Sequence, residues 1–245
     1  MNDLINKCHK LIIAYQNGDL GQTKMPEDSH PATFKNNEEK LCYFTLPMAL
    51  NYQRNSYKLW EAAFLTYQDH QTRILFNVKK SSEIPSDELR VLLSKYKLAL
   101  QPNKHITTWQ TICDTVSNKF GTISQMINQS DHDFLKLQKI IQKDYKKGFP
   151  YLSGPKIFNY WSYILWQYGG IDLINREYIE IAPDTHVIQC SVKLGIITSS
   201  EADILSRNEI SRRWREALNG SKIDPIIMHS PLWFWSRNGF KYDLD

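Results

Sequence analysis

The sequence predicts a mainly α-helical protein. Apolar residues recur at helical spacing along most of the chain, and residues that favour helix starts precede several of these stretches. Signals for strands are few, and no sequence repeat is evident. The 245 residues can form one or two domains with a substantial core, because 42 % of them are hydrophobic and only 10 are glycine and 10 proline.

The first half of the chain is expected to hold helices separated by polar loops. Leu4, Leu11 and Tyr15 share one face of a helix that Asn17-Gly18 ends, and Ser86 is expected to cap a helix with acidic residues in its first turn. The expected elements are a helix over 2–16, a polar loop or short strand pair over 18–40, one or two buried aromatic-rich helices over 44–69 with polar interruptions at 51–55, a short strand over 73–78, and a helix from 86 to about 97.

The second half is expected to contain shorter helices. Ser130-Asp131-His132-Asp133 has the polar residues of a helix cap, Gly148-Phe149-Pro150 breaks the chain, and Gly169-Gly170 ends a helix. The expected helices cover 107–118, 123–127, the stretch from the cap at 130–133 to 145, 155–168, 184–194, 200–205 and 209–218.

Charge, cysteines and hydropathy narrow the class of protein. A net charge of +4 permits nucleic-acid binding without requiring it. The four cysteines lie far apart and lack the spacing of a metal site or an iron–sulfur cluster, so we expect reduced thiols at Cys8, Cys42, Cys113 and Cys190. No apolar stretch reaches about 18 residues and no secretory leader pattern is evident, so we expect neither a membrane-spanning nor a secreted protein.

The first chemical motif is Gly154-Pro155-Lys156, at the end of the segment YKKGFPYLSGPK. Helices are expected on both sides of this segment, which is typical of a helix-hairpin-helix element. The backbone N–H groups of such a turn and the N-terminus of the next helix can bind a phosphate. An ordinary loop with solvated lysines explains the segment better when it is taken alone. We expect phosphate contacts from Lys146, Lys147, Ser153 and Gly154.

The second motif, Asp184-Thr185-His186-Val187, has the aspartate at the start of an expected helix, 28 residues after Lys156. A helix N-terminus stabilises an ionised carboxylate. An amine nucleophile and a carboxylate together can act at a sugar carbon, because the amine attacks the carbon and the carboxylate stabilises its positive charge. Asp184 alone is also a good helix N-cap. The joint occurrence of the two motifs therefore carries the hypothesis.

In this order the two motifs resemble the helix-hairpin-helix (HhH-GPD) DNA glycosylase superfamily, and most of all its archaeal-type 8-oxoguanine DNA glycosylase/AP lyase family. The similarity covers residues 145–240 and, more weakly, 45–70. Leu152 stands where the hairpin usually has its first glycine, and the lysine–aspartate spacing is long. The residues that carry the resemblance are Trp60-Glu61, Gly154–Lys156, Ile181–Val187, Leu194-Gly195, Arg213-Trp214 and 226–233.

The resemblance implies a role for each matching residue. Lys156 would be the Schiff-base nucleophile, Asp184 the essential carboxylate and Trp233 an aromatic that stacks on the extruded base. Trp60, Tyr160 and His229 would complete the base pocket, although His229 stands where the family tends to have an acid. His186 would contact a phosphate. Because a nucleophilic amine must be neutral, we expect both burial and nearby cations at Lys156, which together would lower the pKa of its amine.

The resemblance also implies the architecture and the partner. One helical subdomain would comprise 1–70 and 200–245 and form one wall of the cleft. The other would comprise 71–199, with the hairpin at about 140–168 and the aspartate helix. The substrate would be double-stranded DNA with a damaged base, handled by a monomer without metal or organic cofactor, in the cytoplasm at the nucleoid or in the nucleus. After base loss, the lysine–sugar imine would permit β-elimination and thus lyase activity.

Two points stay open. A non-catalytic helix-hairpin-helix DNA-binding protein, or a glycosylase of the same fold acting on another base or nucleoside, would share these motifs. Arg212-Arg213-Trp214-Arg215 fits a solvated helix face and a phosphate contact equally well.

Trp161, Trp166 and Trp214 are expected in the core. Trp233-Phe234-Trp235 cannot all face one way, so at least one of these rings should be exposed or line a groove.

Overall fold

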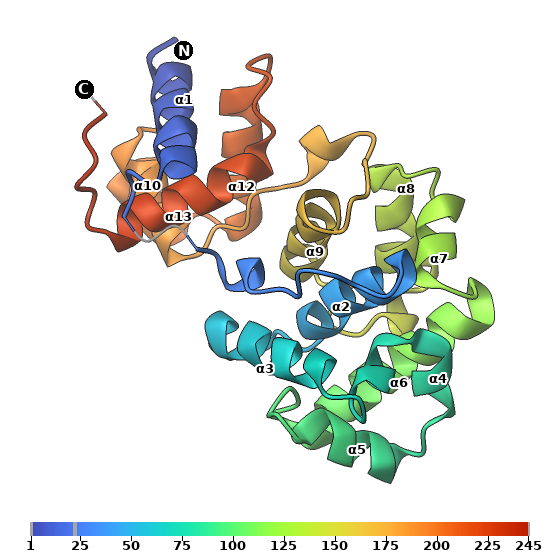
Figure 1. The fold of residues 1–245 in the computed structure, drawn as a ribbon. Helices are drawn as coiled ribbons and strands as arrows, with labels where there is room; N and C mark the ends of the chain where they lie inside the picture. The colour runs from blue at the N-terminus through green and yellow to red at the C-terminus, as the bar shows by residue number, and fades with distance from the viewer. Residues whose placement is uncertain (1, 22–23, 245) are drawn as a thin grey trace. The chain divides into compact units, whose positions relative to one another are not determined.

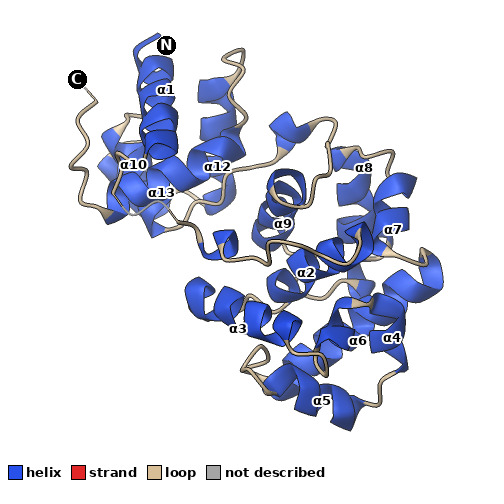
Figure 2. Cartoon of the chain, viewed as in Figure 1, coloured by secondary structure: helices blue, strands red, loops and turns tan. Residues whose placement is uncertain are grey.

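The computed structural model describes residues 2–21 and 24–244, and these residues form helices and loops (Figures 1 and 2). The structure is 66 % helical, with 13 α-helices and no strand among the described residues. The mainly α fold predicted from the sequence is therefore confirmed. None of the described helices is both long enough and apolar enough to cross a membrane. All four cysteines are buried and free.

Contacts divide the chain into two compact units. One unit is Met25–Ile174, and the other joins Met1–Lys24 to Asn175–Asp245. These limits differ from the predicted subdomain limits, which placed 25–70 with the C-terminal segment and 175–199 with the hairpin. The difference has a physical cause in the first case: α2 (Asn37–Ala49) packs against α9 (Pro155–Gln167), the helix that follows the hairpin, so both contribute to one core.

The Met25–Ile174 unit is built around α2. Every residue from Leu41 to Ala49 is buried, because the apolar run faces neighbours on all sides. Asn36 caps the helix, and its side chain accepts a hydrogen bond from the Glu39 N–H at 2.9 Å. Trp161 of α9 donates its indole N–H to the Thr45 hydroxyl at 3.0 Å, so a polar group in this core is satisfied.

Further helices complete this unit, and Figure 1 shows α6 and α4 side by side. The other elements of the unit are η1 (Pro26–Asp28), α3 (Ser56–Gln68), η2 (Arg73–Phe76), α4 (Val78–Glu83), α5 (Ser86–Ser94), α6 (Pro102–Lys119), α7 (Ile123–Gln129), α8 (Phe134–Lys139), the π-helical turn η3 (Ile140–Asp144) and η4 (Lys146–Gly148).

Several local expectations are corrected in this unit. Residues 73–78 are a 3-10 turn followed by the start of α4, because Asn77 caps that helix through the Lys80 N–H. The described part of 18–40 contains no strand pair and instead includes η1 and the start of α2. Ser86 is the first residue of α5 rather than its cap, and α5 ends at Ser94 instead of near residue 97.

The other unit packs α13 (His229–Arg237) against α1 (Asn2–Asn17) and α10 (Thr185–Lys193). Tyr15 and Phe234 stack with ring centroids 5.9 Å apart, which fixes α1 on α13. Trp214 donates its indole N–H to Ser191 at 2.8 Å, which ties α12 (Arg207–Leu218) to α10. The remaining elements are η5 (Arg176–Tyr178), α11 (Ser199–Ile204) and η6 (Pro225–Met228).

Candidate functional site

Lys156 lies in the first turn of α9, directly after the segment 145–154 for which the sequence predicted a hairpin. We call this segment the hairpin below. Gly154 is the N-cap residue and Pro155 occupies the first helical position, where its missing N–H and fixed φ suit a helix start. Phe149 and Leu152 are fully buried and anchor the hairpin to the core. Tyr151 adopts the left-handed conformation, with φ of 60°. The chain therefore makes its unusual turn one residue before Leu152, so no glycine is needed at that position.

The hairpin leaves only some of its backbone donors available. The N–H of Ser153 donates to the Phe149 carbonyl and the N–H of Gly154 to the Tyr151 carbonyl, both at 2.9 Å. These two groups, which we expected to contact phosphate, are therefore already engaged. Gly154 has no side chain to cap α9, so the N–H groups of Lys156 and Ile157 in its first turn have no side-chain cap.

The Lys156 side chain is exposed, contrary to the expected burial. Among the described residues, no carboxylate lies within ion-pair distance of its ammonium group. An exposed lysine is free to move toward a substrate, but nothing in its own unit excludes water from it.

Asp184 belongs to the other unit and caps α10. Its Oδ1 atom accepts a hydrogen bond from the Val187 N–H at 2.9 Å, and the residue is half-buried. The extended backbone of Asp184 and the missing i−4 partner at Val187 make this a standard N-cap. Because the bond uses one carboxylate oxygen, the other oxygen is left to interact with positive charge.

The segment before Asp184 is held by α12. Ser211 donates its hydroxyl to the Ile181 carbonyl at 2.9 Å, and the Arg207 guanidinium donates to the Pro183 carbonyl. The Asp184 N–H donates to the Ala182 carbonyl at 2.8 Å. These bonds hold residues 181–184 in place and thereby orient the Asp184 carboxylate at the start of α10.

An aromatic and basic cluster lies beside the start of α10. His186 and Trp233 meet edge to face with centroids 5.4 Å apart, and the Arg237 guanidinium lies 4.5 Å from the centre of the Trp233 ring. Ser236 links the two helices, because its hydroxyl lies 3.0 Å from His186 Nδ1 and donates to Gln189 at 2.6 Å. The structure thus brings together two predicted site residues, His186 and Trp233, and adds Arg237.

None of the three rings is exposed, since Trp233 is half-buried and Phe234 and Trp235 are buried. Trp235 lines two surface hollows, so the expectation that at least one ring would be exposed or line a groove is met by Trp235. His229, predicted for the base pocket, is the first residue of α13 and is 8 % exposed. A base could reach His229 only after neighbouring side chains move. Of the three tryptophans expected in the core, Trp161 and Trp214 are fully buried and Trp166 is half-buried.

Trp60 and Tyr160, the other predicted pocket residues, have partners inside the Met25–Ile174 unit. Trp60 is 1 % exposed and packs on Tyr43 and Phe44, with ring centroids 5.9 and 6.0 Å away. It is therefore a core residue in this structure. Tyr160 is half-buried and donates its hydroxyl to Glu27.

Glu27 is a residue that the sequence analysis did not single out. Its side chain is 1 % exposed, and burial raises the pKa of its carboxyl to about 7 although the Tyr160 hydrogen bond acts in the opposite direction. The next residue, Asp28, accepts a hydrogen bond from Tyr168 at 2.6 Å. Both acids lie in a polar segment after Pro26, and only the tertiary contacts with α9 distinguish Glu27 from an ordinary loop acid.

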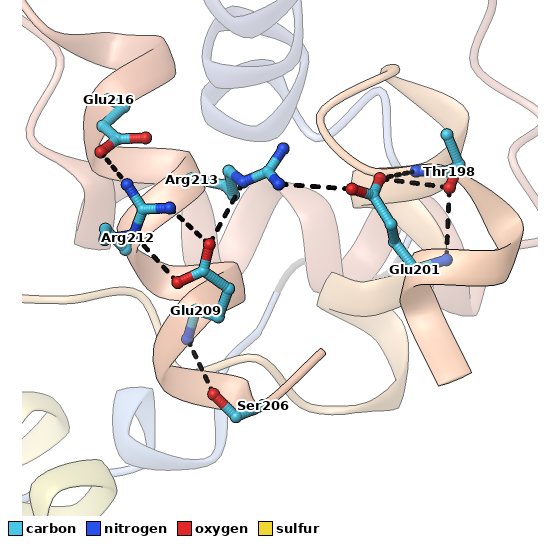
Figure 3. A network of polar contacts seen from close by, with 7 residues as sticks. All are labelled: Thr198, Glu201, Ser206, Glu209, Arg212, Arg213 and Glu216. Carbon is cyan, nitrogen blue, oxygen red and sulfur yellow. Dashed lines mark hydrogen bonds and ion pairs between the residues drawn. The ribbon is translucent and has the colours of Figure 1, made fainter. Parts of the chain in front are cut away.

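Acidic residues pair with Arg212 and Arg213 of α12 (Figure 3). Arg212 pairs with Glu209 and Glu216, and Arg213 contacts Glu201 at 3.3 Å and Glu209 at 3.4 Å. Arg215 pairs with Glu180 at 2.9 Å. These pairs favour the solvated helix face over a phosphate contact, since a phosphate would have to compete with each carboxylate.

Within the described residues, no three side chains of His, Cys, Asp or Glu come together in a way that could hold a metal ion. Comparison of the chain with known protein families and with curated protein sequences found no match.

Proposed function

We propose that the protein is a bifunctional DNA N-glycosylase/AP lyase of the helix-hairpin-helix class, acting on an oxidised purine in double-stranded DNA, with 8-oxoguanine as the first substrate to test. Lys156 is the Schiff-base nucleophile and Asp184 the assisting carboxylate. The observation that carries the proposal is the arrangement at α10. The carboxylate of Asp184 is held in place at the N-terminus of this helix, and His186 in its first turn contacts the Trp233 ring.

The α10 arrangement suits a flipped nucleotide. A base taken out of a duplex has to be held on an aromatic face, and Trp233 is the least buried of the three rings at 233–235. The Arg237 cation beside that ring adds attraction for DNA. The partly available Asp184 carboxylate can stabilise the positive charge that develops on the sugar as the base leaves.

Lys156 supplies the nucleophile in this proposal. Its neutral amine attacks C1′ of the deoxyribose, and the bond from C1′ to the base breaks. The base leaves with the bonding electrons and takes up a proton. The amine gives up one proton, and the C1′–O4′ bond breaks as O4′ takes up a proton, so that the sugar ring opens and a protonated imine forms between Nζ and C1′. Removal of a C2′ proton then expels the 3′ phosphate by β-elimination, which cuts the strand.

A non-catalytic DNA-binding protein is the second candidate, and one observation favours it. Lys156 is exposed and lacks the burial that usually accompanies a nucleophilic lysine. The uncapped first turn of α9 and the lysines of the hairpin would bind phosphate without any chemistry at Nζ.

Incubation with a panel of single-lesion duplexes separates the two candidates. Labelled duplexes that carry 8-oxoguanine, uracil, an abasic site or no lesion are treated with the protein and run on a denaturing gel. The proposed enzyme cuts the 8-oxoguanine and abasic strands and leaves the undamaged strand intact. Binding to all four duplexes with no strand cut would reject the proposal and support the non-catalytic protein.

A further inference from the structure

A hollow of about 590 Å³ lies beside the hairpin in the Met25–Ile174 unit. We call it the lysine groove, and its walls come from the C-terminal part of α6 and from the segment 143–148. Four lysines line it: Lys119, Lys143, Lys146 and Lys147.

The groove has an excess of uncompensated positive charge. All four lysines are exposed, and none of them forms an ion pair within the described part of the chain. Of the two carboxylates in the lining, Asp144 is engaged by Lys139 at 2.6 Å. Asp114 is half-buried, and burial raises the pKa of its carboxyl. The groove therefore favours an anion over a cation.

An aromatic ring lies among these cations. Tyr145 is 36 % exposed, and its ring meets the buried Phe120 edge to face at a centroid distance of 5.1 Å. This contact holds the tyrosine in place and leaves part of the ring open to the groove. An aromatic ring next to cations is the combination that binds single-stranded nucleic acid, because each base can stack while its phosphate pairs with a lysine.

The two walls are in close contact. A Cβ atom at Gly148 would lie 2.5 Å from Thr115 Oγ1 and 2.6 Å from its Cγ2, so only glycine permits this approach of η4 to α6. The contact holds Lys146 and Lys147 on the same groove as Lys119. The site is thus shaped by packing and is more than a set of surface lysines on one loop.

We propose that the lysine groove binds a single-stranded segment of DNA, with phosphates on the lysines and one unpaired base stacked on Tyr145. A duplex would offer its phosphates to the lysines but no base face to the tyrosine. The inference rests on the proposed function only for DNA as the partner, and none of the chemistry at Lys156 enters it.

The test is the affinity of the full chain for a fluorescent oligothymidylate, measured by anisotropy between 50 and 200 mM salt. The variant Lys119→Gln/Lys143→Gln removes two cations from the groove. The plot of log affinity against log salt should lose about 1.4 in slope, since each phosphate contact on a single strand contributes about 0.7. The matched control is Lys79→Gln/Lys80→Gln on α4 of the same unit, whose slope loss should be no more than about 0.3.

Tyr145→Ala tests the stacking contact separately. It should weaken binding to the single strand about 5-fold or more while duplex binding changes less than about 2-fold, and Tyr145→Phe should retain wild-type affinity. Thermal melting of each variant checks that the fold is intact.

An unchanged slope in the groove variant, or equal losses in the groove and control variants, would overturn the lysine groove as a binding site. Equal weakening of duplex and single-strand binding by Tyr145→Ala would overturn the stacked base. The result is independent of lesion cleavage, so a protein that cuts no lesion can still confirm the groove, and an active glycosylase can still reject it.

Discussion

The carboxylate of Asp184 accepts a hydrogen bond from the Val187 N–H at 2.9 Å. This bond makes Asp184 a structural cap as well as the proposed catalytic carboxylate, and the two roles can be separated by substitution. Asparagine and aspartate are equally good helix caps, whereas alanine is a poor one.

Asp184→Asn should therefore keep the fold and lose the chemistry. We expect the free energy of unfolding to change by less than about 0.5 kcal/mol, and strand cutting to fall about 100-fold or more because the negative charge is gone. Asp184→Ala should in addition lose about 1 kcal/mol of stability. Urea denaturation and single-turnover cleavage measure the two effects. Equal cleavage by Asp184→Asn and wild type would restrict Asp184 to its capping role.

Trp233→Ala should weaken the recognition of damaged DNA. Loss of a stacking face is expected to reduce affinity for the 8-oxoguanine duplex about 5- to 150-fold, while affinity for an undamaged duplex stays within about 2-fold. Trp233→Phe keeps an aromatic face against His186 and should recover part of the loss. Anisotropy titrations with both duplexes test this. A uniform loss on both would place Trp233 outside the base pocket.

Glu27→Gln should alter the pH dependence of stability. Burial raises the pKa of the Glu27 carboxyl from about 4.5 to about 7, so the folded state holds its proton more tightly than the unfolded chain. The stabilising contribution of the protonated group is complete below pH 4.5 and is lost as the pH rises to 7. We therefore compare the free energy of unfolding of Glu27→Gln with that of wild type. This difference should favour the variant by up to about 3 kcal/mol more at pH 8 than at pH 5.

Urea denaturation at pH 5 and pH 8 measures this difference. Glu209→Gln is a control whose difference from wild type should be nearly the same at pH 5 and pH 8, because hydrogen bonding from Arg212 lowers the pKa of Glu209 to about 2 and both pH values lie above that pKa and above the ordinary one. The ionised carboxylate of Glu209 stabilises the folded state when the pH lies above the ordinary pKa of this group. This stabilisation is lost as the pH falls toward 2. If Glu27→Gln and wild type differ in stability by the same amount at pH 5 and pH 8, the pKa of the Glu27 carboxyl is not raised by burial.

Arg213→Gln should leave DNA binding almost unchanged. Its guanidinium already contacts Glu201 and Glu209, so it is not available as a phosphate contact. We expect the salt slope for duplex binding to stay within about 0.3 of wild type, whereas the loss of one phosphate contact would lower it by about 0.9. A drop of that larger size would show that the carboxylates release Arg213 to the DNA.

Local sequence signals predicted much of the helical structure, because caps and breaks act within a few residues. Asp184 and Asp133 were expected at helix starts, and each side chain accepts from the first-turn N–H groups. The helix after Asp133 continues as a π-helical turn to Asp144, close to the predicted end. In contrast, α13 was not predicted, since its residues Leu232 to Trp235 form an apolar run without helical periodicity.

The site was less accessible to prediction, because burial depends on packing between distant segments. Trp60 is a core residue because α2 supplies Tyr43 and Phe44 against it. Glu27 becomes a buried acid through Tyr160, which lies 133 residues later. The pair of His186 and Trp233 follows from the packing of α10 on α13, and the sequence indicated the two residues but not their contact.

Borohydride trapping on an 8-oxoguanine duplex tests the central claim most directly, because reduction fixes the imine between the enzyme and the sugar. Wild-type protein should form a covalent complex, Lys80→Gln on α4 should still form it, and Lys156→Gln should form none. A covalent complex of undiminished yield with Lys156→Gln would contradict the account, since another amine would then be the nucleophile.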